Sequence, residues 1–134
     1  MNGTVDAAAL EDQLRTRHRR CLPALSRLRL LAEHGGETGV DVRAATAEVM
    51  VELGAAESIL LDALSRSARR EALAHFLARR VDRLAIVAEK AAATADAGDQ
   101  PSLRRLLYQF HALAEAMWEV QLSLQTHDRG RWRD

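Results

Sequence analysis

Apolar side chains recur with the period of an α-helix along four long segments of this chain. Within each segment they lie three or four residues apart, so they share one side of a helix while charged residues occupy the other. Ala, Leu, Arg and Glu, all good helix formers, supply 73 of the 134 residues, whereas Val, Ile and Thr supply 16. Because strands are built mainly from β-branched and aromatic residues, the sequence predicts an all-α fold.

The periodicity also predicts how the helices are connected. Helices are expected at residues 6–33, 40–64, 68–95 and 101–126. Long helices joined by a few residues must fold back on one another, so we expect an antiparallel up-down-up-down four-helix bundle. A single domain over residues 1–126 would then be followed by a short basic tail, 127–134.

Proline and glycine mark the boundaries of these segments. The apolar stripe continues beyond Pro23, which predicts a kinked first helix rather than a helix that ends there. Gly98 followed by Asp99 and Pro101 is the usual order of a helix stop and a helix start. The apolar face changes direction across residues 64–71, which favours a short break between the second and third helices.

Charge is segregated along the chain although 19 basic and 19 acidic residues balance. Residues 13–32 carry six arginines and no acid, whereas residues 37–62 carry six acids and only Arg43 as a base. We expect the acids of the second helix on its solvent face, and compensation between the first two helices along their shared flank. The balance excludes a polycationic protein that coats nucleic acid.

The single cysteine, Cys21, falls on the apolar stripe of the first helix and is interpreted as a small buried side chain rather than a nucleophile. One cysteine forms no internal disulfide, which is typical of a reducing compartment. The chain shows no secretory signal pattern and no apolar run of membrane-spanning length. We therefore expect a soluble, cytoplasmic protein without a membrane partner.

The five histidines do not follow a known metal-binding spacing, so we expect neither a metal nor another cofactor. One alternative remains open. His18 and His111 lie at the flanks of the core faces of the first and fourth helices, and Glu115 follows His111 by one turn. If these residues converge, the interior of the bundle would bind a metal or another ligand as a sensor.

A second alternative comes from the segment RREALAHF, in which Arg70 and His75 form an Arg-x4-His pattern. This pattern resembles the motif of HEPN domains, which are all-α ribonucleases of about this length. The resemblance covers six residues and implies a catalytic pair at a dimer interface, with RNA as the partner. The chain departs from the family at Glu71, where an Asn or Asp commonly follows the arginine.

The core stripes of the last two helices can be assigned from the same period. The third helix is expected to bury Leu73, Phe76, Leu77, Val81, Leu84, Val87, Ala88 and Ala91. The fourth is expected to bury Leu103, Leu106, Phe110, Leu113, Met117, Val120 and Leu124.

The fourth helix carries a second apolar line beside this stripe. The line consists of Leu107, His111, Ala114, Trp118 and Leu122. An apolar face of this width indicates either deep burial within the bundle or a contact with another protein, where tryptophan is enriched.

No glycine-rich phosphate loop, no Ser/His/Asp order and no paired carboxylates are recognisable. The first hypothesis is therefore a non-catalytic association or regulatory module, a homodimer through the second line of the fourth helix, with itself or another protein as partner. The ribonuclease and the sensor are the alternatives.

Overall fold

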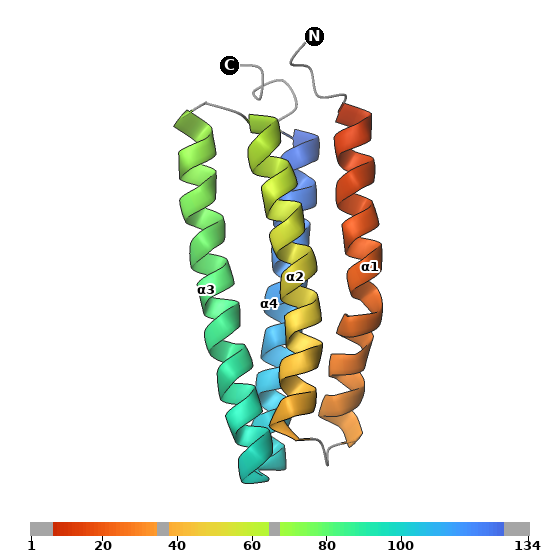
Figure 1. Cartoon of the computed structure of the whole chain (residues 1–134), viewed down its shortest axis with the longest axis vertical. Coiled ribbons are helices and arrows are strands. Elements are labelled where there is room, and N and C mark those ends of the chain that lie inside the picture. Colours follow the sequence, from red (N-terminus) through yellow and green to blue (C-terminus); the bar gives the residue numbers. More distant parts are fainter. Residues whose placement is uncertain (1–6, 35–37, 65–67, 128–134) are drawn as a thin grey trace.

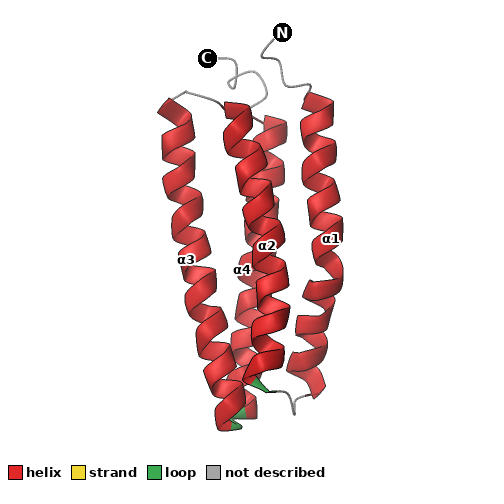
Figure 2. Cartoon of the chain, in the orientation of Figure 1, coloured by secondary structure: helices red, strands yellow, loops and turns green. Residues whose placement is uncertain are grey.

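The structure, a computed structural model, describes residues 7–34, 38–64 and 68–127, and these form helices without any strand (Figure 2). The helices are α1 (Ala7–His34), α2 (Gly39–Leu64), α3 (Ala68–Ala97) and α4 (Gln100–His127). The predicted all-α class is confirmed, and each helix end lies within two residues of its predicted position. The predicted tail begins inside α4 at His127, and its remaining residues, 128–134, lie outside the described part of the chain.

The four helices lie side by side as a bundle (Figure 1). α1 and α3 each pack against both α2 and α4, and α2 and α4 also approach each other across the interior. Arg17 and Arg27 of α1 form ion pairs with Glu52 and Glu48 of α2, so the two helices run antiparallel. Contacts of α2 with α3, and of α1 with α4, show the same reversal.

One core of leucine, alanine, valine and a few larger side chains runs along the bundle axis. Its largest fully buried members are Trp118, Phe110, Leu14, Leu25, Leu28, Leu53, Leu60, Leu77, Leu84, Leu103, Leu107 and Met117. α1 continues through Pro23, which lies on the exposed side. A helix that accepts proline on its solvent side keeps its apolar stripe in register on both sides of it, as predicted.

The connection between α3 and α4 is built by the residues that predicted it. Gly98 has a φ of 76°, and its N–H donates to the Ala95 carbonyl while the Asp99 N–H donates to that of Thr94. This is a Schellman motif, which needs a residue that tolerates positive φ. The Asp99 carboxylate accepts from the Ser102 N–H and caps α4. Hydrogen bonds from the Ser102 side chain and backbone hold the pKa of Asp99 below its usual range.

The start of α2 is capped by a pair that the sequence analysis did not use. The Thr38 hydroxyl and the Asp41 carboxylate bond to each other and to each other's backbone N–H groups. This Thr-x-x-Asp arrangement is a form of the capping box, a signal readable in the sequence. The Gly39 N–H donates to Oδ1 of Asp96 at 2.7 Å, which ties the start of α2 to the end of α3.

Phe76 corrects the predicted core of α3. It is 39% exposed, and the guanidinium carbon of Arg80 lies 4.7 Å from the centre of its ring. The ring is covered by a cation–π contact on the surface rather than by the core. Leu73 and Val81 are only partly buried, whereas Leu77 and Leu84 are fully buried, so this half of α3 presents a narrower apolar face than predicted.

Candidate functional site

The second apolar line of α4 lies inside the bundle. Leu107, Ala114 and Trp118 are buried within the single chain, and His111 and Leu122 are partly buried. A side chain that its own helices already cover offers no surface to a second chain. The three buried residues of the predicted association surface are thus covered by the chain's own helices, which agrees with the other interpretation of this line, deep burial. The physical reason is that α4 packs against three helices, so a single apolar stripe is too narrow to supply all of its contacts.

Trp118 is the centre of a mixed polar and apolar cluster between α1 and α4. Its ring lies 5.1 Å from that of His18, measured between centroids, at an interplanar angle of 52°. Cys21, one turn further along α1, is fully buried, as predicted. Burial raises the pKa of the Cys21 thiol from 9.0 to about 11, and a hydrogen bond with the Trp118 side chain offsets only part of this rise. The thiol is protonated at neutral pH and is no nucleophile.

Gln121 belongs to the same region and was missed by the sequence analysis. It is fully buried, one turn beyond Trp118 on α4, and no described group bonds to its amide nitrogen or oxygen. The signal was present: Gln121 follows Leu107 and Ala114 at intervals of seven residues, which keeps it on the same face. Polarity alone made it look like a surface residue.

The alternative metal site does not assemble. His18 lies beside Trp118, whereas His111 lies seven residues away from Trp118 along α4, about 10 Å at 1.5 Å per residue. Burial lowers the pKa of His111; Glu115 opposes this effect and Arg29 adds to it. Within the described residues, no three His, Cys, Asp or Glu side chains gather as ligands for a metal.

The structure does not bring Arg70 and His75 together within the chain. α3 is a regular helix across both, and residues five apart on such a helix point in different directions. Nε of Arg70 donates to the Leu61 carbonyl of α2 at 3.1 Å, while His75 is exposed. The observed role of Arg70 is to bond the C-terminal end of α2, whose last carbonyls lack partners within the helix.

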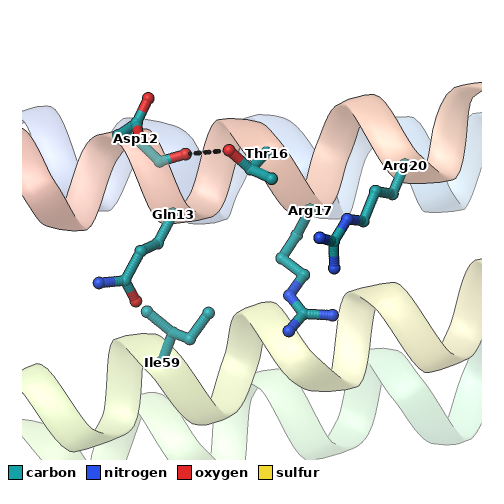
Figure 3. A pocket seen from close by; sticks show the side chains of 6 residues that line it. All are labelled: Asp12, Gln13, Thr16, Arg17, Arg20 and Ile59. Carbon is teal, nitrogen blue, oxygen red and sulfur yellow. Dashed lines mark hydrogen bonds between the residues drawn. The ribbon is translucent and has the colours of Figure 1, made fainter.

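An open groove of about 180 Å³ lies between α1 and α2 (Figure 3). It is lined by Asp12, Gln13, Thr16, Arg17, Arg20 and Ile59. The Thr16 hydroxyl bonds the Asp12 carbonyl, and Arg17 is paired with Glu52, so part of the lining is already engaged. Ligand pockets are usually larger and more apolar, whereas this groove is an open seam between two helices lined largely by charged and polar side chains.

Of the acids expected on the solvent face of α2, Asp41 and Asp62 are exposed, whereas Glu48 and Glu52 lie on the flank beside α1. Glu52 pairs with Arg17 at 3.2 Å and Glu48 with Arg27 at 3.1 Å, which confirms the expected compensation between the first two helices. On the other flank Arg43 pairs with Glu89 of α3 at 3.6 Å.

With the charges drawn to both flanks, the outer face of α2 is an uncharged strip between Val40 and Ser58. Its residues follow one another at intervals of four, three, four, three and four, which places them on one face of the helix. They are Val40, Ala44, Ala47, Val51, Gly54 and Ser58, and we call them the α2 strip. Val40 is 72% exposed and Val51 is 66% exposed, the two highest values among the large exposed apolar residues described.

None of the four helices, over the residues described, combines the length and the hydropathy needed to cross a lipid bilayer. Comparison of the chain with protein-family models, with curated proteins and with solved structures finds no significant similarity.

Proposed function

We propose that this chain is a non-catalytic association module that works as a homodimer, and that the α2 strip is the contact surface. The observation that carries the proposal is the exposure of Val40 and Val51 on a helix face without charge. Any regulatory role of the module then depends on the partner with which it associates. This retains the first hypothesis from the sequence but moves its surface from α4 to α2.

The dimensions of the α2 strip suit a helix-to-helix contact. From Val40 to Ser58 it spans 18 residues, about 27 Å at 1.5 Å per residue. A helix that is apolar on its outer face as well as its inner face is normally covered on both sides. Alanine and glycine along the strip allow a second helix to approach closely.

A second copy of the same strip is the occupant that these residues fit best. The spacing reads the same in both directions, so two antiparallel copies related by a two-fold axis meet residue for residue. In that register Val51 of each copy faces Ala47 of the other. Val40 then faces Ser58, and Ala44 faces Gly54. Each valine thus meets a small residue, which is the complementarity that close packing of two identical helices requires.

Electrostatics does not oppose this contact. The ionised groups that border the middle of the strip, Glu48, Glu52 and Arg43, are each paired with a residue of α1 or α3. Asp41 and Asp62 lie at its two ends. Bringing two strips together therefore leaves no unpaired charge at the centre of the interface, where such a charge would cost several kcal/mol.

The test is sedimentation of the whole chain and of Val51→Glu. The wild type is expected to sediment as a dimer, and Val51→Glu as a monomer with unchanged helix content. Two carboxylates, each opposite Ala47 of the other copy, would then be buried near the centre of the contact. Ile86→Glu is the matched control, since Ile86 is 57% exposed but lies on α3, away from the strip.

The proposal would be overturned by a wild type that stays monomeric at about tens of micromolar, a concentration at which even a weak specific dimer is populated. A dimer that dissociates equally in both variants would overturn it as well. A dimer that survives Val51→Glu and dissociates with Ile86→Glu would place the contact on α3 instead.

A further inference from the structure

All the buried side-chain nitrogen and oxygen atoms without a hydrogen-bond partner, among the residues described, belong to three residues at one level of the bundle. They are Nε2 of His18, Nε1 of Trp118, and both Nε2 and Oε1 of Gln121. His18 and Trp118 are in ring contact, and Gln121 is the next residue along the same side of α4. The four atoms therefore form a cluster rather than scattered exceptions.

Elsewhere in the described interior, buried polar side-chain atoms have hydrogen-bond partners. The Thr46 hydroxyl is buried and donates to the carbonyls of Val42 or Arg43 within its own helix. Native proteins almost always pair buried polar groups, because an unpaired one loses its bonds to water and gains none. A cluster of four such atoms on two facing helices consequently points to a partner from outside the polypeptide.

The atoms define what this partner must be. The Trp118 indole N–H and the Gln121 amide nitrogen only donate, the Gln121 amide oxygen only accepts, and Nε2 of His18 does either according to its tautomer. The thiol of Cys21 interacts with the Trp118 side chain, but sulfur is a weak acceptor, so the indole N–H still lacks a full hydrogen-bond partner. The partner must therefore donate as well as accept, be uncharged, and be small enough for a closely packed interior.

We infer that His18, Trp118 and Gln121 form an internal hydration site, in which buried water links α1 to α4. A water molecule accepts from the indole and amide N–H groups and donates to the amide oxygen and the imidazole, the set of bonds that the cluster offers. Internal waters of this kind typically make about three hydrogen bonds to otherwise unpaired groups. The site accounts for a glutamine and a tryptophan N–H in a core that is mostly apolar.

Proton NMR of the whole chain in water tests this inference. The rotating-frame spectrum is expected to show a cross-peak between water and the indole N–H of Trp118, with the sign of dipolar transfer from a long-lived water. Chemical exchange with bulk water gives the opposite sign and is thereby distinguished. Trp132→Phe assigns the resonance, since the chain has two tryptophans. Absence of the dipolar peak in the folded protein would overturn the inference.

Two substitutions locate the site. Gln121→Leu removes two of the four atoms and is expected to abolish or strongly weaken the dipolar peak while helix content stays near that of the wild type. Gln121→Met serves the same purpose if the leucine variant does not fold. Thr46→Val is the matched control, because it removes a buried polar group that is already bonded, and it should leave the peak unchanged. A peak that persists at full strength in the Gln121 variants would show that the water lies elsewhere.

Discussion

At the scale of single residues, the buried thiol of Cys21 makes the free energy of unfolding depend on pH. Burial raises the pKa of its thiol to about 11, while in the unfolded chain the thiol ionises near 9.0. The unfolded state thus loses its proton first as the pH rises. The free energy of unfolding contributed by Cys21 is therefore complete below pH 9 and is lost progressively up to about pH 11, a change of about 2 to 3 kcal/mol.

Chemical denaturation at a series of pH values between 8 and 11 measures this change, with Cys21→Ala as the reference. Other groups titrate in the same interval, so the difference between the two proteins isolates the thiol. The prediction is that the advantage of the wild type shrinks as the pH rises. An advantage independent of pH would mean that the thiol ionises as readily in the folded state.

Trp118 shows what residue spacing does and does not determine. The period of α4 placed it in an apolar line, but a line of residues is the same whether its own bundle or another chain covers it. We predict that Trp118→Ala lowers the free energy of unfolding by about 3 to 5 kcal/mol, because it leaves a cavity beside Cys21 and His18. Sedimentation should show the same assembly state as the wild type, and a changed state would return the interface to α4.

At the scale of elements, local sequence signals were sufficient to predict where the helices begin and end. Gly98 and Asp99 predicted the α3–α4 connection because a left-handed glycine and a capping aspartate act through their immediate neighbours. The flank of α2 on which Glu48 and Glu52 lie was not predictable from local signals, for the opposite reason. Glu48 and Glu52 are drawn to its flank by the arginines of α1, an effect that depends on how the two helices are turned toward each other.

Alanine substitutions at Gly98 and at Gly54 are predicted to change the stability of the bundle in opposite directions. Gly98→Ala should destabilise the bundle by about 1 kcal/mol, since alanine is strained at a φ of 76°. Gly54→Ala should stabilise it by up to about 1 kcal/mol, because Gly54 lies within α2 and an added methyl group meets no atom of the chain. Thermal melts of both changes in the Val51→Glu background keep association out of the comparison. If both substitutions changed the melting temperature in the same direction, the roles assigned to the two glycines would be contradicted.

At the scale of the whole molecule, the residues that converge in the interior were not predictable from spacing. His18 and His111 both flank their core faces, yet α1 and α4 are aligned so that His18 meets Trp118 instead. Such pairing depends on the relative shift of two helices, and a shift of one turn exchanges every partner. The fold class followed from periodicity within segments, whereas the candidate sites depend on register between segments.

That register leaves the two ends of the bundle unequally secured. At the end containing the α3–α4 connection, Asp96 bonds the Gly39 N–H, and Nε of Arg104 donates to the Ala32 carbonyl at 3.1 Å. Towards the opposite end lie the four polar atoms without protein partners, and the exposed ring of Phe76. At the first end, direct hydrogen bonds therefore join α2 to α3 and α1 to α4. At the second end the Arg70–Leu61 bond joins α3 to α2, whereas α1 and α4 meet around the polar cluster.

Native-state hydrogen exchange should consequently show that the bundle opens first at the end of the polar cluster, because local opening follows the weaker contacts. The amides of Leu14 and Trp118 are expected to exchange faster than those of Leu28 and Leu107, which are comparably buried near the secured end. Asp96→Ala removes the bond to Gly39 and should speed exchange at Leu28 and Leu107 toward the rates of the other pair. Identical rates for all four amides in the wild type would indicate that the bundle opens only as a whole, and the reverse order would show that the inter-helix bonds do not secure their end.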